Sequence, residues 1–256
     1  MNILLTNDDG IYAEGIYALY LELRKIARVT IVAPDTERSA SGHAITLTDP
    51  LRVEKAVKKG KFLGYKVNGT PADCVKIGIG AVLKKKPDMI FSGINQGPNI
   101  GTNVIYSGTV SAATEGAILG IPSIAVSLTT FTDPDFSLAA AFSRRLCLLA
   151  LKRGIPEGTL LNVNVPAAGK NRIKGVRVTH QGKFRFAEFF KKRSDPRGRG
   201  YYWMGGEEVT PFREPEADHA AVNGRFISIT PIHYDMTSYC DIPVIKGWDF
   251  KSCLRS

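Results

Sequence analysis

Two adjacent aspartates, Asp8 and Asp9, follow the first apolar run of the chain, in the stretch "LLTNDDGIYAEG" at 4–15. Like charges this close disfavour simultaneous ionisation unless something cationic compensates them. Three compensating groups are possible: the N-terminus of the helix expected from about Glu14, a distant Lys or Arg, or a divalent cation. Capping of that helix would account for one carboxylate. The second remains, and carboxylates on rigid loops suit Mg²⁺, Mn²⁺ or Ca²⁺.

Further oxygen ligands stand on neighbouring predicted loops. The hydroxyl of Ser39 or Ser41, in "DTERSASGH", and the amide of Asn95, in "SGINQGPNIGTN", follow the ends of predicted strands. Ligands of open α/β sheets bind outside the carboxyl ends of the strands, so these loops are expected to converge. A mixed carboxylate, amide and hydroxyl site is the resulting prediction.

The segment "YSGTVSAATEG" at 106–116 offers a complementary anion site. Ser107, Gly108 and Thr109 fall where a helix begins, so backbone N–H groups and hydroxyls would face a bound phosphate. The alternative is a helix cap with no ligand. Neither a Walker A loop nor a GxGxxG fingerprint occurs. A metal loop and an anion loop at one sheet edge together indicate phosphoryl transfer.

His43, in "SASGHAIT", lies near the proposed site and is a candidate acid or substrate contact; a local hydrogen-bonding role is the alternative. A covalent aspartyl phosphate is less favoured than metal-activated water, because the DxDx[TV] spacing is absent. The three other histidines show no metal-ligand spacing. The four cysteines form no CxxC pair, so we expect them to be reduced.

The elements that must position these residues alternate in type. Apolar runs at 2–5, 28–34, 89–91 and 123–127 predict strands, and "EGIYALYLELRKIA", a segment from Thr70 to about Lys85, and 108–120 predict helices. The expected fold class is α/β, with a Rossmann-like, mostly parallel sheet flanked by helices.

After about Thr130 the alternation of strands and helices becomes less regular. A helix at 136–151, a strand near 160–165 and β-like stretches "GVRVTHQGK" and "FISITPI" are expected. We interpret 1–256 as a single domain, with a catalytic core at about 1–165 and a C-terminal β-rich extension at about 166–256. That extension would carry a projecting arm or hairpin for oligomerisation.

The formal net charge is +10, and the basic window 183–199 contributes much of it. Its interleaved phenylalanines suit either a nucleic-acid backbone or an arm whose aromatic side chains pack on a partner subunit. No apolar run approaches the length of a membrane helix. The N-terminus lacks the features of a signal peptide, so a cytoplasmic location is expected.

Five blocks of the chain resemble the SurE ("survival protein E") family: "ILLTNDDGIYAEGI", "VAPDTERSASGHAIT", "NGTPADCV", "SGINQGPNIGTNVIYSGTVSAATEG" and "ISITPIHYDMT". They follow the family order over almost the whole chain. The resemblance implies a Rossmann-like core, a C-terminal arm exchanged between subunits in a homodimer or homotetramer, and a metal-dependent phosphatase of nucleoside monophosphates. Some members of the family also shorten polyphosphate or accept 3′-nucleotides.

Residue by residue, the resemblance implies that Asp8, Asp9, Ser39 and Asn95 bind one Mg²⁺ or Mn²⁺ per subunit. It also implies phosphate binding at 107–109. The clearest departure lies in "EADHAAVNGRFISITP", where the family usually has Thr-Asp in place of Ala217-Asp218.

These observations predict a 5′-nucleotidase in which Asp8 and Asp9 are catalytic as well as metal-binding. Asn95, Ser107, Gly108, Thr109 and His43 are the predicted substrate contacts. No membrane and no specific nucleic-acid partner are expected. Two rivals stay open: a metal-dependent nucleotide-sugar transferase, and a non-enzymatic nucleic-acid binder built on the basic window 183–199.

Overall fold

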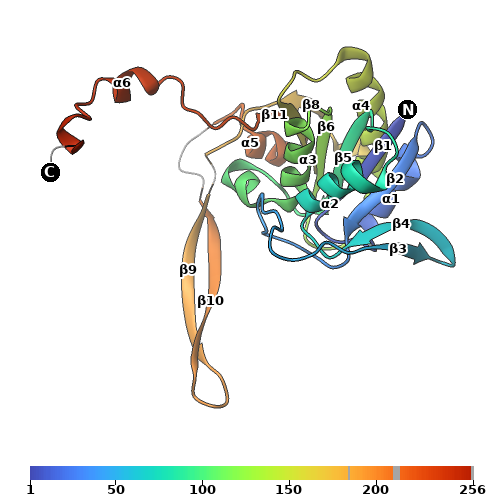
Figure 1. Ribbon diagram of the computed structural model, residues 1–256, viewed down its shortest axis with the longest axis horizontal. Coiled ribbons are helices and arrows are strands. Elements are labelled where there is room, and N and C mark those ends of the chain that lie inside the picture. The colour runs from blue at the N-terminus through green and yellow to red at the C-terminus, as the bar shows by residue number, and fades with distance from the viewer. Residues whose placement is uncertain (184, 210–213, 255–256) are drawn as a thin grey trace.

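A nine-stranded sheet forms the centre of the molecule (Figure 1), in a computed structural model that describes residues 1–183, 185–209 and 214–254. The strand order is β3-β4-β2-β1-β5-β6-β7-β11-β8. The strands are β1 (Asn2–Thr6), β2 (Arg28–Pro34), β3 (Val53–Lys58), β4 (Lys61–Val67), β5 (Met89–Gln96), β6 (Ser123–Thr129), β7 (Thr159–Pro166), β8 (Gly175–Val178) and β11 (Phe226–His233). Neighbours from β4 to β7 run parallel, whereas β3 and β11 pair antiparallel with β4 and β7.

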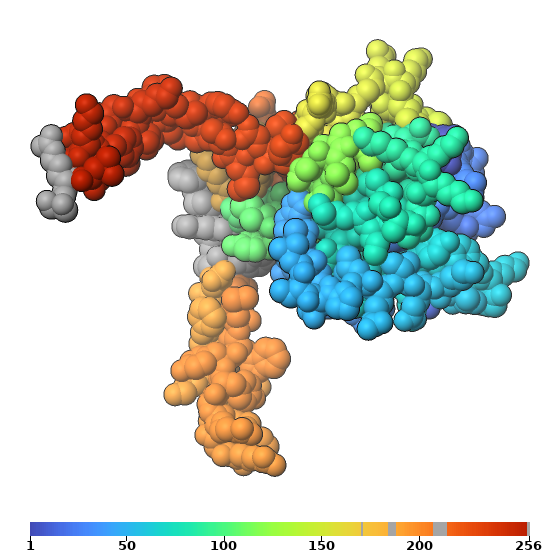
Figure 2. Space-filling view, viewed as in Figure 1, coloured from blue at the N-terminus to red at the C-terminus, as the bar shows by residue number. Residues whose placement is uncertain are grey.

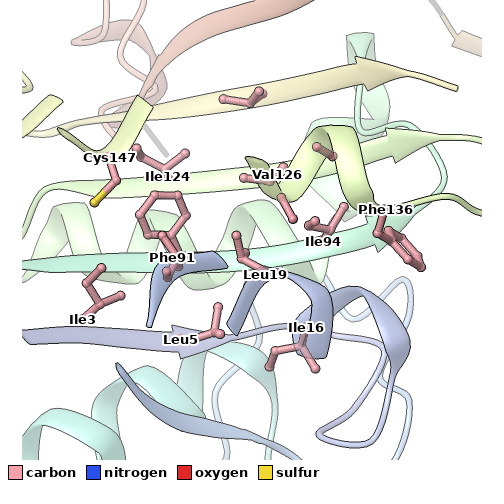
Figure 3. Packing of buried hydrophobic residues seen from close by; sticks show 14 of the residues in the cluster. Ile3, Leu5, Ile16, Leu19, Phe91, Ile94, Ile124, Val126, Phe136 and Cys147 are labelled. Atoms are coloured by element: carbon pink, nitrogen blue, oxygen red, sulfur yellow. The ribbon is translucent and has the colours of Figure 1, made fainter. Parts of the chain in front are cut away.

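Helices cover both faces of this sheet, in agreement with the burial of its inner strands. The helices are α1 (Glu14–Leu23), α2 (Pro71–Ile77), α3 (Gly108–Ile118), α4 (Ser137–Arg153), and the short α5 (Asp218–Asn223) and α6 (Ile242–Lys246). Side chains of α1 and α4, such as Leu19 and Cys147, pack with Phe91 and Ile124 of the sheet (Figure 3). Residues of α2 and α3 pack on the other face. The predicted α/β class is confirmed.

The first half of the chain differs from the prediction at two elements. The helix that begins at Pro71 ends at Ile77 and continues as a π-helical turn, η1 (Gly78–Val82), rather than reaching Lys85. Its start is as predicted, with Thr70 at the N-cap and Asp73 completing a capping box. The hairpin β3–β4 was not predicted at all.

The last third of the chain contributes to the main sheet as well as to an arm. Strand β11 lies between β7 and β8, so it is an internal strand. A second, two-stranded antiparallel sheet, β9 (Arg185–Ser194) and β10 (Gly200–Val209), projects from the body, and the C-terminal segment with α6 extends away from it (Figures 1 and 2). A projecting hairpin is therefore present in the region where an arm was expected. Within the described ranges, no helix is long and apolar enough to cross a membrane.

Candidate active site

The strand order changes direction at β1. The chain moves from β1 to β2 on one side and, after β4, returns to β5 on the other side of β1. Ligand sites of open α/β sheets form at such a switch point, outside the carboxyl ends of the two strands. Asp8 and Asp9 follow β1, and Asn95 lies at the end of β5. The structure thus brings the two predicted metal loops side by side.

Asp8 is buried, with 4% of its surface exposed. Its carboxylate accepts a hydrogen bond from the Thr109 hydroxyl, and its carbonyl oxygen accepts one from the Arg38 N–H. Burial raises the pKa of Asp8, although the hydrogen bonds from Thr109 oppose that rise. Asp8 is thus held between the first loop, the loop that carries Ser39 and the start of α3.

Asp9 is partly buried beside Asp8. The pKa of Asp9 is raised to about 7, mainly by burial and secondly by the negative charge of Asp8. Among the described residues, no Lys, Arg or His forms an ion pair with either carboxylate. Helix capping is not their role either, because α1 begins after Ala13 and has no side-chain cap. Two of the three compensating groups considered from the sequence are therefore not found in the described structure.

Asn95 reaches the site through an irregularity in β5. The register against β6 shifts between Gly93 and Asn95, and a bulge of this kind redirects the following side chain. The Nδ2 of Asn95 donates to the Gly97 carbonyl at 2.8 Å. That bond fixes the amide orientation, and it leaves the Oδ1 as the acceptor available to a ligand.

A cavity of about 360 Å³ joins the predicted site residues. Asp8, Asp9, Ser39, Asn95 and Ser107 all line it. Ser39 is exposed, and its hydroxyl donates to the Glu37 carboxylate at 2.6 Å. The alternative hydroxyl ligand, Ser41, is not among the lining residues.

The first residue of α3, Gly108, lies in close contact with Asp8. A Cβ added to Gly108 would lie 2.7 Å from the Asp8 Cβ, so only glycine fits at this first helical position. Ser107 is the N-cap, and its hydroxyl oxygen accepts the Val110 N–H at 3.1 Å. The hydroxyl proton of Ser107 remains available to a ligand in the cavity. Thr109 is fully buried against Asp8 and does not line the cavity.

A buried asparagine network supports the loop between β5 and α3. The Asn99 N–H donates to the Asn164 Oδ1 at 2.9 Å, and its Nδ2 donates to the Ser127 hydroxyl at 2.8 Å. The Asn99 carbonyl accepts from both Asn162 and Asn164. These partners lie on β6 and β7, so the loop that borders the cavity is anchored to two neighbouring strands.

The C-terminal region holds the same loop from another direction. Asp218 is fully buried and accepts hydrogen bonds from the N–H groups of Gly101 and Gly182, at 2.8 and 3.1 Å. Gln181 donates to the Gly101 carbonyl. Ala217, which stands where the family usually has threonine, is the N-cap of α5 and makes no side-chain cap. The departure therefore falls on a helix cap and leaves the Asp218 contacts in place.

His43 does not line the cavity. Its Nε2 lies 3.0 Å from the buried Glu115 carboxylate, which also pairs with Lys76 at 2.8 Å. These contacts fasten the loop after Ser39 to α2 and α3, and the substrate role predicted for His43 stays a prediction.

Several residues that line the cavity were not predicted, among them Glu37, Tyr106 and Phe131. Tyr106 and Phe131 expose 62% and 75% of their surfaces, and Phe131 lies against Gly97, whose added Cβ would be 2.6 Å from the ring. Tyr106 directly precedes Ser107, so proximity in the sequence could have indicated it. Phe131 belongs to a distant loop and gave no such signal.

The chain is similar to members of one protein family over most of its length. Residues 3–188 match the family described as Survival protein SurE. A protein of Syntrophus aciditrophicus named 5′-nucleotidase SurE is 56% identical over 96% of this chain and 93% of its own. A protein of the same name from Syntrophobacter fumaroxidans is 51% identical over 97% of this chain and 100% of its own. A crystal structure of SurE protein from Aquifex aeolicus has a TM-score of 0.85 at 44% identity, covering 96% of this chain and 98% of the other.

Proposed function

This chain belongs to the SurE family, and from that premise we propose that it is a 5′-nucleotidase. The reaction is hydrolysis of nucleoside 5′-monophosphates to nucleoside and inorganic phosphate. One observation carries the proposal beyond the shared names: two carboxylates that form no ion pair with a described residue, and a helix N-terminus, meet at one cavity at the switch point of the sheet. Related activities on 3′-nucleotides and short polyphosphate belong to the same proposal.

The site residues fit one divalent cation. Asp8 and Asp9 lack a cationic partner among the described residues, and the amide oxygen of Asn95 and the hydroxyl of Ser39 complete a set of oxygen donors. The described residues contain no group of three or more His, Cys, Asp or Glu side chains placed to hold a metal ion by themselves, so the site does not resemble a zinc site. Oxygen ligands of this type suit Mg²⁺ or Mn²⁺. When bound, such an ion polarises a phosphoryl oxygen and lowers the pKa of water.

The chain's own residues supply the rest of the chemistry. The Ser107 hydroxyl and the first N–H groups of α3 bind the phosphoryl oxygens, where the helix dipole favours negative charge. Asp9 orients the attacking water and accepts its proton at a carboxylate oxygen. Thr109 holds Asp8 in place through its hydroxyl. Tyr106 and Phe131, at the mouth of the cavity, contact the nucleoside.

Phosphate release from AMP, GMP and tripolyphosphate tests the proposal. We expect activity with Mn²⁺ or Mg²⁺, loss of activity in EDTA, and recovery when metal is added back. Asp9→Asn should lower kcat by about 100-fold or more, because it removes both a metal ligand and the base. Full activity in EDTA, or an unchanged rate for Asp9→Asn, would refute the metal-dependent mechanism.

The same assay separates the rivals. A nucleotide-sugar transferase would retain a nucleoside diphosphate without releasing inorganic phosphate. A nucleic-acid binder would show salt-sensitive binding that survives Asp9→Asn. Assembly through the C-terminal arm and a cytoplasmic location remain part of the proposal.

A further inference from the structure

A second cavity, of about 600 Å³, lies at the opposite end of the sheet from the site described above. Its walls include Asn2 and Arg28, the first residues of β1 and β2, together with residues of β4 and the segment after η1. Asp8 is six residues beyond Asn2, so the two cavities are separated by about 20 Å along the strand direction. Nothing that occupies one could touch the other.

The charged side chains that line this cavity are all basic. Arg28, Lys84 and Lys85 all contribute to its wall, and the lining includes no Asp or Glu. None of the three forms an ion pair with a described residue. The carboxylate of nearby Asp88 already accepts the Asn2 N–H at 2.7 Å. Three like charges gathered in this way favour a polyvalent anion.

The opposite wall is aromatic and apolar. Phe62 exposes 56% of its surface and meets Tyr65 edge to face, with ring centroids 5.3 Å apart. Ile31 and Leu63 line the same cavity and are almost fully buried. An exposed aromatic ring at a cavity is the kind of surface on which a flat heterocycle stacks.

The backbone of β2 supplies polar groups between these two walls. Its ladder with β4 begins only at Val32 and Tyr65, whereas residues 28–31 pair with β1 alone. The same residues line the cavity. Part of the backbone there is therefore open to hydrogen bonding by the edge of a bound base.

We propose that this cavity is a second nucleotide site, for a nucleoside di- or triphosphate whose base stacks on Phe62 and whose phosphates contact Arg28, Lys84 and Lys85. The cavity holds none of the residues placed in the hydrolytic site. Binding here requires no divalent metal ligand from the protein, so it is separable from hydrolysis.

Calorimetric titration of the full-length protein with ATP in EDTA tests the site directly. We expect saturable binding, weakened at least tenfold by Lys84→Glu with Lys85→Glu. The matched control is Lys55→Glu with Lys152→Glu, which makes the same charge change at two exposed lysines outside the cavity and should stay within twofold of wild type. Thermal unfolding of each variant verifies folding.

Two further measurements identify the ligand class and its position. Phe62→Ser should weaken ATP binding severalfold but leave tripolyphosphate binding unchanged. Photolabelling with 8-azidoadenosine triphosphate in EDTA should modify the tryptic peptide 62–66, in wild type and in Asp9→Asn alike.

The proposal would be overturned by an absence of ATP binding in EDTA, by equal binding to the double-glutamate variant, or by labelling confined to other peptides. Equal affinity for tripolyphosphate and ATP with no effect of Phe62→Ser would also overturn it, since the cavity would then bind only phosphate. None of these results depends on phosphate release from AMP, so the hydrolytic proposal is tested separately.

Discussion

The carboxyl group of Asp9 makes the stability of the metal-free protein depend on pH. Its pKa is about 7 in the folded protein, against an ordinary value of 3.8. Between these values the folded state binds more protons than the unfolded state, so the free energy of unfolding falls as pH rises through this window. The raised pKa of Asp8 acts in the same direction.

We therefore expect the melting temperature in EDTA to fall more between pH 5.5 and 8 for wild type than for Asp9→Asn. At pH 8 the variant should melt about 4 °C higher, which corresponds to ~1–2 kcal/mol. Added Mn²⁺ should raise the wild-type melting temperature more at pH 8 than at pH 5.5, because binding requires the ionised carboxylates. Parallel pH profiles for the two proteins in differential scanning fluorimetry would contradict this assignment.

The hydrogen bond from Thr109 to Asp8 gives a second test that concerns single residues. The Thr109 hydroxyl donates to Asp8, and a hydrogen bond from behind a metal ligand fixes that ligand and favours its charged form. Thr109→Val keeps the shape and removes the donor, so the Mn²⁺ concentration for half-maximal phosphate release should rise about tenfold. Thr109→Ser retains the hydroxyl and should remain close to wild type. Equal metal requirements for the two variants would show that the hydroxyl has no such role.

Several site residues could be predicted because they depend on a simple rule of topology. Asp8, Asp9 and Asn95 follow or end strands, Ser107 begins a helix, and a parallel sheet with crossover helices places such positions at one edge. Glu37 and Phe131 reach the cavity through irregular loops, whose paths are set by contacts such as the Gln96 side chain to the Phe131 carbonyl. Side-chain hydrogen bonds between distant loops leave no periodic signal in a sequence.

At the level of elements, the close approach of α3 to the first loop depends on Gly108. In most helix positions Ala is more stable than Gly, by roughly 0.5–1 kcal/mol. Here the added Cβ would lie 2.7 Å from the Asp8 Cβ, so α3 and the loop that carries Asp8 would have to separate.

Gly108→Ala should lower both the melting temperature and the rate of phosphate release, the latter by about tenfold or more, since displacement of a catalytic group by about 1 Å is costly. The matched control is Gly80→Ala in η1, where an added Cβ would meet nothing within 4 Å. If both variants behave alike in thermal unfolding and kinetics, the close approach is not essential.

The hairpin β3–β4 shows where prediction from sequence was limited. Of the six residues of β3, only Ala56 is buried, so the strand lacks the apolar alternation that identifies most strands. Its turn places Lys59 and Gly60 at positive φ, of 51° and 74°. Asn-Gly or Asp-Gly is the usual sequence signal for such a turn. Here Lys59 takes the place of the Asn or Asp, so the signal is absent from the sequence. Lysines on an edge strand also discourage pairing with other chains.

At the level of the whole molecule, the hairpin β9–β10 and the C-terminal segment project from the body (Figure 2). Both carry large exposed aromatic side chains. Tyr201 and Trp203 lie on one face of the hairpin in a T-shaped contact, 6.5 Å between ring centroids. Exposed aromatic surface of this kind is typical of protein interfaces. This supports the proposal that the arm contacts another copy of the chain.

Replacing Tyr201 and Trp203 by serine should therefore reduce the mass of the assembly in light scattering after size exclusion. Phe62→Ser is the control, because it removes a comparably exposed ring from the body and should leave the mass unchanged. The same mass for wild type and the double variant would remove these two rings from the interface.

The position of β11 also bears on how the protein is made. Residues 226–233 come near the end of the chain, yet they separate β7 from β8 within the sheet. During synthesis, β1 to β7 can emerge and pair in order, but one side of β7 stays unpaired until β11 has left the ribosome. Asp218, which holds the Gly101 N–H beside the cavity, emerges just before β11. A nascent chain thus anchors the loop beside the cavity and fills the second side of β7 only after these late segments have been synthesised.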